Sequence, residues 1–392
     1  MLTAAAGRAD IPGAKRHRWA YRFLRTLIIW PVRWLFNAHI ERIPPLPWPA
    51  LILPNHTADI DILLIGIAQR KPMYFMAAEQ IFQNPLIGQL VHYLFAPIVK
   101  RKGASDAKAV RETLRRIRLG ESVCVFPEGN TSFDGLSGPI TTAIGRLLQA
   151  SDAGLVTYRI EGGYFTWPRW GHSIRRGGIT GRPMRVLSPE QVRDMPIEQL
   201  ADLIRDDLFV DAYAVQQKAP VAYRGRRLAH GLYNVLYLCP SCQSMGTLTT
   251  AGDTFRCSCG LEGTYAQTGM LQNVPFATIR EWAHWQRQAL LERALNAPDC
   301  AVIEDENQVL YQLDTQGHMT QVAQGKLTMG LNQLSLGDFT LATNDLAGLD
   351  IYRRNTIMFS TCQGHQYQIG SAHQRSGLPY RDLYRSLLDR KG

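Results

Sequence analysis

The chain has 392 residues, of which 45% are apolar, and its formal net charge is +10 with an isoelectric point near 9.3. This length and apolar content suit one large folded domain with one or two small ones, and they exclude a mainly disordered chain. The excess of basic residues favours an anionic partner, namely nucleic acid, acidic lipid headgroups or a phosphorylated substrate.

Residues 17–36, HRWAYRFLRTLIIWPVRWLF, interleave arginine and aromatic side chains with Leu and Ile. This pattern is typical of a helix that lies in the interface of a membrane, and Pro31 should kink it. The alternative is an amphipathic helix that packs on the protein core. The chain shows no uncharged apolar stretch of about 18 residues and no signal-peptide pattern. We therefore predict an N-terminal tail and interfacial helix over residues 1–36, and neither a spanning helix nor export.

Short apolar runs alternate with helical patterns after the proline-rich segment 42–50. This alternation predicts an α/β domain over residues 37–225. Ser105 and Gly120 are expected to cap and to end the helix that follows the third strand. The expected strands are 50–53, 72–78, 96–101, 122–126 and 154–162, and the expected helices are 59–70, 84–95, 105–120 and 141–151.

The character of the chain changes after residue 231. A cysteine-rich segment, 231–270, is followed by a helix at 274–295, by several short strands and by an amphipathic helix at 378–391. Several antiparallel strands with one C-terminal helix predict a small α+β, PH-like module over residues 271–392. The expected strands are 301–305, 309–314, 326–330, 349–354, 356–361 and 367–370.

A pair of candidate catalytic residues, His56 and Asp61, interrupts the apolar run LILPNHTADIDILL. On a regular helix these side chains would lie about 140° apart. They can meet only if His56 lies on a strand-to-helix loop, with Thr57 as the N-cap, and Asp61 in the first turn. The carboxylate would then hold one imidazole nitrogen and leave the other free as a general base. The alternative is polar residues that decorate a helix N-terminus.

The segment SVCVFPEGNTSFDG ends an apolar strand with Phe126, Pro127, Glu128 and Gly129. Proline stops a strand, and glycine permits an unusual backbone angle and the close approach of a ligand. Glu128 is placed to bind a hydroxylated or cationic group of a substrate. The alternative is a tight turn with a solvent-exposed glutamate.

A third segment, FAPIVKRKGASDAKAV, places Arg101 between two lysines after a strand. Loops at the carboxyl ends of strands collect ligands in α/β sheets, and arginine suits a bidentate phosphate contact. A solvated basic run is the alternative.

Together these segments resemble the glycerolipid acyltransferase family, best known through its 1-acyl-glycerol-3-phosphate acyltransferases. The family's first block, Asn-His followed by four residues and Asp, matches Asn55, His56 and Asp61. Its second block resembles YFMAAEQIFQNPLIGQLVHYLFAPIVKR, which ends at Arg101, and its third block, Phe-Pro-Glu-Gly, stands at 126–129. Order and spacing agree over roughly residues 40–165.

The resemblance implies an O-acyltransferase that uses acyl-CoA or acyl-ACP as co-substrate and needs no metal for this step. His56 would take the proton of an acceptor hydroxyl, and Asp61 would orient the imidazole. Asn55, Arg101 and the four residues from Phe126 to Gly129 would bind substrate. The expected acceptor is 1-acyl-glycerol-3-phosphate, which would become phosphatidic acid.

The sequence also departs from the family pattern. Many members carry lysine where Ala78 stands and arginine where Thr131 stands, so a basic phosphate ligand is missing. Arg159, or Arg175 and Arg176, could compensate. Glycerol-3-phosphate and a lyso-aminolipid therefore stay open as alternative acceptors.

The segment LCPSCQSMGTLTTAGDTFRCSCG holds four cysteines in a Cys-x-x-Cys and a Cys-x-Cys-Gly motif. Two such motifs on hairpin turns supply four thiolates for tetrahedral Zn²⁺, and a site with all four positions filled is structural. An iron–sulfur site or free thiols are the alternatives. We therefore predict a zinc ribbon over residues 231–270 with the ligands Cys239, Cys242, Cys257 and Cys259.

The predicted fold class is α/β: an acyltransferase-type domain with an N-terminal membrane-interfacial helix, then a zinc ribbon and a small α+β (PH-like) domain. The expected partners are a membrane surface rich in anionic phospholipid, the acyl thioester of coenzyme A or acyl carrier protein, and a lysophospholipid. The expected location is the cytoplasmic face of the cell membrane, peripherally bound, with no nucleic acid as partner. A zinc-ribbon nucleic-acid-binding protein and a non-catalytic membrane adaptor are the alternatives.

Overall fold

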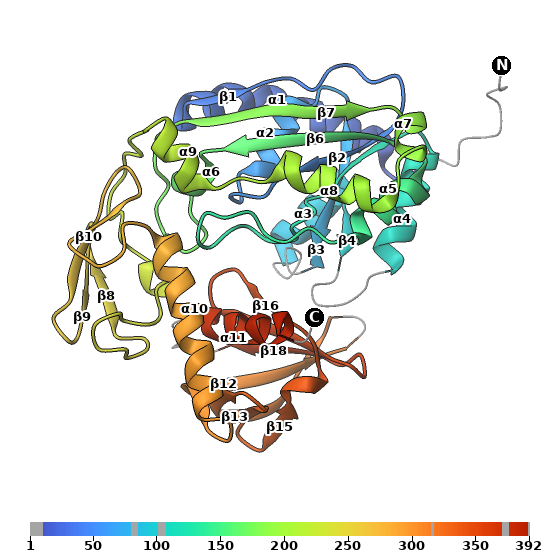
Figure 1. Ribbon diagram of the computed structural model, residues 1–392. Coiled ribbons are helices and arrows are strands. Elements are labelled where there is room, and N and C mark those ends of the chain that lie inside the picture. Colours follow the sequence, from blue (N-terminus) through green and yellow to red (C-terminus); the bar gives the residue numbers. More distant parts are fainter. Residues whose placement is uncertain (1–10, 80–84, 101–106, 315–316, 371–375, 391–392) are drawn as a thin grey trace. The chain divides into compact units, whose positions relative to one another are not determined.

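The computed structural model describes residues 11–79, 85–100, 107–314, 317–370 and 376–390. These residues divide into two compact units (Figure 1). Within the described ranges, unit 1 contains the chain up to Pro168 and then Ile174–Arg224, whereas unit 2 contains Arg169–Ser173 and the chain from Gly225 onward. Each unit is described by itself below.

Unit 1 is built on a seven-stranded sheet with the strand order β1-β7-β6-β2-β5-β3-β4. Neighbouring strands run parallel except for the antiparallel pair β6 and β7. The carboxyl ends of β2, β3, β4, β5 and β6 therefore meet at one edge of the sheet, where α/β proteins collect ligands. The strands are β1 Ala38–Ile40, β2 Ala50–Pro54, β3 Met73–Ala78, β4 Ile98–Lys100, β5 Ser122–Cys124, β6 Gly154–Glu161 and β7 Ile179–Leu187.

Helices cover both faces of this sheet. Successive side chains along β2 point to opposite faces and enter two different cores. Ala50 and Ile52 point into a core shared with α1 and α2. Leu51 and Leu53 point into a second core shared with α4, α5 and α8. A strand buried on both faces is apolar throughout, as β2 is. The helices are α1 Ala14–Phe36, α2 Asp61–Ala68, α3 Pro85–Phe95, α4 Ala107–Arg118, α5 Ala143–Ser151, α6 Gly163–Thr166, α7 Pro189–Arg193, α8 Ile197–Leu208 and α9 Ala212–Lys218.

Helix α1 begins at Ala14, ahead of the predicted start, and Pro31 lies inside it. One side of the helix packs on the sheet through Tyr21, Val32 and Phe36. The other side carries large exposed apolar side chains. Within the described residues, no helix combines the length and the hydropathy needed to cross a bilayer.

Within its described residues, unit 2 contains two antiparallel sheets, two α-helices and two 3₁₀-helices. The small sheet has the order β11-β10-β9-β8, and the large one has the order β15-β14-β13-β12-β18-β17-β16. The elements are η2 Leu232–Asn234, β8 Leu248–Ala251, β9 Thr254–Cys257, β10 Glu262–Tyr265, β11 Leu271–Gln272, α10 Ile279–Asn296, β12 Ala301–Leu313, β13 Met319–Gly330, β14 Gln333–Leu336, β15 Phe339–Ala342, η3 Thr343–Asp345, β16 Leu346–Tyr352, β17 Thr356–Thr361, β18 Gln366–Gly370 and α11 Leu378–Asp389.

Several expected elements differ from those observed. The two strands predicted at 301–305 and 309–314 are one strand, β12, whose pairing with β13 shifts between Asp305 and Gln308. Asn307 has a positive φ of 57° there, so a bulge interrupts the polar-apolar pattern without ending the strand. The predicted N-cap Ser105 lies outside the described residues.

Candidate active site

His56 lies on the loop between β2 and α2, and its Nδ1 is 3.1 Å from an Asp61 carboxylate oxygen. Asp61 is the first residue of α2, so its side chain can point back toward the loop. The helix N-cap is Ile60, which makes no side-chain cap; the prediction of Thr57 as N-cap was therefore wrong. Thr57 instead donates its hydroxyl and its backbone N–H to Asp61.

The Asp61 carboxylate is fully buried and is surrounded by donors. It accepts the backbone N–H groups of Thr57 at 2.5 Å and of Ala58 at 2.9 Å, and the Thr57 hydroxyl at 3.1 Å. Backbone N–H groups at the start of a helix favour a negative charge. Several donors thus hold this carboxylate as a rigid acceptor for the imidazole.

The orientation of His56 leaves one ring nitrogen available for chemistry. A carboxylate can only accept, so Nδ1 carries the proton and donates it to Asp61. Nε2 then holds a lone pair, and within the described ranges it has no hydrogen-bond partner. The His56 side chain is 15% exposed, and the Phe126 ring stacks on it with centroids 4.2 Å apart.

Glu128 supports the same loop from the end of β5. Its two carboxylate oxygens accept the backbone N–H groups of His56 at 2.9 Å and of Gly138 at 2.6 Å. Burial raises the pKa of Glu128 to about 7, the N–H groups of Gly138 and His56 oppose that rise, and the charge of Asp61 adds to it. Both oxygens are engaged with backbone, so the geometry supports a positioning role for Glu128, and its substrate contact stays a prediction.

The turn that carries Glu128 is closed locally. Gly129 has a positive φ of 72°, and its N–H donates to the Phe126 carbonyl at 3.1 Å. Glycine adopts this conformation without strain, whereas Pro127 ends the extended chain before it. Pro127 is half-buried and Gly129 is exposed, so the turn presents its glycine to solvent.

Asn55 extends the pairing of β2 with β6 through its side chain. Its amide donates to the Ile160 carbonyl at 2.9 Å and accepts the Ile160 N–H at 2.6 Å, and its backbone N–H donates to Tyr158. The side chain is fully buried. Asn55 was predicted to bind substrate, but this amide mimics a peptide group and anchors the loop that carries His56.

Two glycines that support the loop, Gly138 and Gly163, are not among the site residues predicted from the sequence. A Cβ atom at Gly163 would lie 2.1 Å from the Thr57 hydroxyl and 3.3 Å from an Asp61 carboxylate oxygen. Only glycine leaves this space for the loop. The signal that could have shown it is the Gly-Gly pair directly after an apolar strand, which marks a close approach of two backbones.

The basic residues considered as phosphate ligands have other surroundings. Arg101 lies outside the described residues. Arg159 donates to the carbonyl groups of Asp206 and Asp207 at the end of α8. Arg175 is buried, and Arg176 donates to the Trp34 carbonyl. Arg159 and Arg176 are thus engaged by backbone and are not grouped around His56.

The four clustered cysteines lie together in unit 2, with all four sulfur atoms within 4.8 Å of one another. The Sγ atoms of Cys239 and Cys259 are 3.8 Å apart, and those of Cys242 and Cys257 are 3.7 Å apart. Four sulfurs at about 2.3 Å from a tetrahedral Zn²⁺ are separated by about 3.8 Å. The Thr247 hydroxyl contacts Cys257 at 3.0 Å and so orients one ligand. This donor set fits a tetrahedral metal ion.

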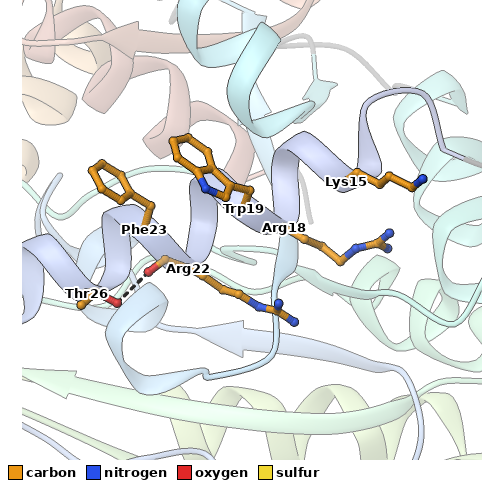
Figure 2. Close-up of a pocket in the computed structure, with 6 residues that line it drawn as sticks. All are labelled: Lys15, Arg18, Trp19, Arg22, Phe23 and Thr26. Carbon is orange, nitrogen blue, oxygen red and sulfur yellow. Dashed lines mark hydrogen bonds between the residues drawn. The ribbon is translucent and has the colours of Figure 1, made fainter.

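Helix α1 presents an exposed apolar stripe, which we define as Trp19, Phe23, Leu27, Trp30 and Trp34. Trp30 and Trp34 are 75% and 72% exposed, although Trp is normally mostly buried. Figure 2 shows Trp19 and Phe23 on one side of the helix, with Lys15, Arg18 and Arg22 pointing to another. The rings of Trp19 and Phe23 stack with centroids 5.1 Å apart. Helix α1 thus carries an apolar stripe beside a basic flank, which we define as Lys15, Arg18 and Arg22.

In a comparison with known protein families, residues 37–161 match the family model named Acyltransferase. A 1-acyl-sn-glycerol-3-phosphate acyltransferase of Limnanthes douglasii is 23% identical over 202 residues, which cover 49% of this chain and 68% of that protein. A lyso-ornithine lipid O-acyltransferase of Rhodobacter capsulatus is 34% identical over 93 residues, which cover 24% of this chain and 32% of that protein.

Two further matches have similar or lower identity. The chloroplastic 1-acyl-sn-glycerol-3-phosphate acyltransferase LPAT1 of Arabidopsis thaliana is 26% identical over 125 residues, 32% of this chain and 35% of that protein. The solved 1-acyl-sn-glycerophosphate acyltransferase PlsC of Thermotoga maritima is 19% identical, with a TM-score of 0.43, over 52% of this chain and 82% of its own. The chain thus spans from about a third to two thirds of the length of these curated relatives.

Proposed function

Since residues 37–161 form a domain of the acyltransferase family, we propose that the chain moves a fatty acyl group from an acyl thioester to the hydroxyl of a lysophospholipid. The observation that carries this proposal is the imidazole of His56. Its Nδ1 is held by the buried Asp61 carboxylate, whereas its Nε2 stays free of hydrogen bonds within the described residues. This arrangement is that of an oriented general base.

The proposed reaction uses the chain's own groups at each proton transfer. Nε2 of His56 takes the hydroxyl proton while the acceptor oxygen attacks the thioester carbonyl carbon. The Asp61 carboxylate stabilises the imidazolium that forms. The carbon–sulfur bond then breaks, and the imidazolium returns its proton to the leaving thiolate of coenzyme A or acyl carrier protein. General-base assistance is worth 10²- to 10⁴-fold, or about 3 to 5 kcal/mol of barrier.

The acceptor we favour is 1-acyl-glycerol-3-phosphate, because relatives from Limnanthes and Arabidopsis carry that name. A lyso-aminolipid is the second candidate. It is supported by the match to a lyso-ornithine lipid O-acyltransferase and by the uncharged residues Ala78 and Thr131. A substrate panel separates the two.

We further propose that α1 docks the enzyme on the cytoplasmic face of the cell membrane as a peripheral protein. Its apolar stripe and basic flank suit the boundary between headgroups and acyl chains. Both the acyl product and the lysolipid are amphiphiles that reside at that boundary. An enzyme docked there meets its acceptor without extracting it into water.

In unit 2 we propose a structural Zn²⁺ held by Cys239, Cys242, Cys257 and Cys259, whose sulfur spacing fits the ion. When bound, the ion cross-links the two cysteine motifs, and with four thiolates it has no open position for substrate. We also propose that the large sheet with helix α11 is a PH-like module, since seven antiparallel strands precede one C-terminal helix.

The experiment offers a labelled acyl thioester and a panel of lysolipids to the purified full chain. We expect transfer by the wild type and a loss of at least 10²-fold in the His56→Ala variant. His39→Ala, an exposed histidine on β1, serves as the control and should retain activity. Circular dichroism checks that both variants fold. Substantial transfer by folded His56→Ala protein would defeat the proposal.

A further inference from the structure

Two segments of unit 1 run side by side next to α1. The backbone N–H of Ile43, just after β1, donates to the carbonyl of Ala68, the last residue of α2, at 3.1 Å. Arg42 and Arg70 lie on these two segments, and both side chains are exposed. The pairing of the backbones therefore brings two cations from distant parts of the sequence to the same place.

Helix α1 adds two more arginines to this place. Arg25 donates through Nη2 to the Ile67 carbonyl at 2.9 Å, and Arg33 donates through Nη2 to the Ile40 carbonyl at 3.4 Å. Each guanidinium thus reaches one of the two segments. The Nε atoms of both arginines are buried and have no hydrogen-bond partner within the part of the chain that the structure describes.

The four positive charges are close enough to act on one another. The pKa of Arg25 is lowered by burial and by the charges of Arg42, Arg70 and Arg33, with an opposing effect of Tyr21. Across the described ranges none of the four arginines forms an ion pair. Like charges held together without a carboxylate repel one another, and a bound anion would relieve that repulsion.

A simpler explanation covers part of this arrangement. Arg25 contacts a carbonyl in the last turn of α2, where a cation is favoured without any ligand. That contact uses one N–H of a group that has five, and it accounts for neither Arg42 nor Arg70. The unused N–H donors of these arginines distinguish an anion-binding site from the simple capping of a helix.

The location of this cluster selects the anion. Arg33 follows Trp30 by three residues, so their side chains project about 60° apart around α1 and Arg33 borders the apolar stripe. Arg25 follows the buried Tyr21 by four residues and projects about 40° from it, on the packed side of the helix. Guanidinium groups bind phosphate oxygens in a bidentate fashion. We propose that Arg25, Arg33, Arg42 and Arg70 bind the phosphate of an anionic phospholipid headgroup while the stripe contacts the acyl layer. This inference rests on the membrane contact in the proposed function.

The test uses the full chain and vesicles of phosphatidylcholine, with or without phosphatidic acid. We expect wild-type partition to rise when phosphatidic acid is present. The variant Arg42→Gln/Arg70→Gln changes two exposed side chains and so spares the fold. Its partition into vesicles that contain phosphatidic acid should be roughly 10- to 30-fold weaker than that of the wild type, since each basic residue near the surface contributes about 1 kcal/mol. Its weaker binding to pure phosphatidylcholine should be unchanged.

The matched control is Arg118→Gln/Arg146→Gln. These residues are exposed on α4 and α5, which cover the opposite face of the sheet, and the change in net charge is the same. We expect this variant to partition as the wild type does. Equal losses in both double variants would mean that diffuse charge attracts the vesicles, and they would overturn the site.

Three other results would overturn the inference and would locate the failure. Wild-type chain that binds no vesicle would refute the membrane contact of the proposed function together with the site. Wild-type chain that binds both vesicles equally would keep the contact, which Trp30→Ser/Trp34→Ser should then abolish, and would refute the arginine site alone. Inorganic phosphate is added as a competitor at the same concentration as the lipid phosphate. If it displaces the chain from the vesicles, the site binds a soluble ligand instead.

Discussion

Glu128 binds two backbone N–H groups with one buried carboxylate, and the burial of that carboxylate makes stability depend on pH. Burial raises its pKa from 4.5 to about 7, with the N–H groups opposing and Asp61 adding to the rise. Between these two values the folded chain holds more protons than the unfolded chain. The stabilisation from this group is therefore complete below pH 4.5 and is lost as the pH rises through about 7, by on the order of 3 kcal/mol.

We predict that Glu128→Gln removes this loss of stability between about pH 5 and about pH 8. Glutamine also offers one acceptor where carboxylate offers two, so either His56 or Gly138 loses its hydrogen bond and activity should fall about tenfold. Urea unfolding at both pH values and initial rates with the preferred lysolipid measure the two effects. A variant with the pH dependence of the wild type would contradict the assignment.

At this scale the sequence predicts the short-range contact and misses the long-range ones. His56 and Asp61 are five residues apart, so only one local geometry could join them, and the structure shows that contact at 3.1 Å. The groups that hold Asn55 and the His56 loop come from 105 and 72 residues away. No spacing rule reports such partners, so the sequence could not show the backbone contacts of Asn55 and Glu128, whose substrate contacts stay predictions.

The element α6 sets the position of the catalytic loop through its first residue. Gly163→Ala would place a Cβ atom 2.1 Å from the Thr57 hydroxyl. We predict that the loop is displaced, that acyl transfer falls by 10-fold or more as a rough estimate, and that unit 1 stays folded.

The control for this prediction is Gly66→Ala in the middle of α2. A Cβ atom at Gly66 meets nothing within 4 Å, and alanine favours a helix interior over glycine by about 0.5 to 1 kcal/mol. This variant should be active and slightly more stable, as measured by rates and thermal unfolding. Equal activity of the two variants would show that the loop tolerates a side chain at Gly163.

Helix α1 is attached to the sheet at its N-terminal end by His17. The ring is buried and stacks on Tyr74 with centroids 4.2 Å apart. Burial and the charge of Arg116 lower the pKa of His17 from 6.5 to about 4. The unfolded chain thus holds more protons between these values, and stability is lost as the pH falls from 6.5 toward 4, by on the order of 2 to 3 kcal/mol.

We predict that His17→Phe, which keeps the stacked ring, makes the free energy of unfolding less sensitive to acid in this range. Urea unfolding at about pH 7 and about pH 4.5 compares the variant with the wild type. An equal loss of stability in both proteins would show that other groups cause the acid sensitivity.

Among the elements, long periodic segments were predictable and sheet edges were not. The core strand β2 and helix α10 follow from apolar runs and helical period. Strand β1 has three residues and strand β7 alternates only weakly, so neither gives a clear signal. These two strands pair with each other at the edge of the sheet, where tertiary contacts decide the structure.

For the molecule as a whole, we propose that the cysteine cluster makes folding of part of unit 2 depend on a metal. We predict about one zinc per chain when the protein is purified without chelator. Chelation should accelerate hydrogen exchange in β8 and β9, which lie beside the cysteines, because removal of the ion removes the cross-link between the two cysteine motifs. Mass spectrometry of exchanged peptides and elemental analysis provide the measurements.

The matched pair for this prediction is Cys257→Ser and Cys300→Ser. Cys257 belongs to the cluster, whereas Cys300 is exposed and lies outside it. Loss of zinc from the first variant alone supports the site. Wild-type protein with far less than one zinc per chain would remove it.

At this largest scale the alternation of strands and helices predicted the α/β character of unit 1, and three ordered motifs predicted the resemblance to acyltransferases, whose family model matches residues 37–161. The domain boundaries at 36, 225 and 270 stay predictions. Composition could not assign the acceptor, since basic residues are spread over the chain and only their positions in space show which ones converge.

The support of the catalytic pair also has a consequence for synthesis on the ribosome. A nascent chain that has emerged only as far as α5 already contains His56 and Asp61. It lacks β6, whose Ile160 backbone receives the Asn55 side chain, and it lacks Gly163. Such a chain holds the proposed catalytic residues without the contacts that anchor their loop, so we expect the proposed acyl transfer to begin only when the sheet of unit 1 has been translated and assembled.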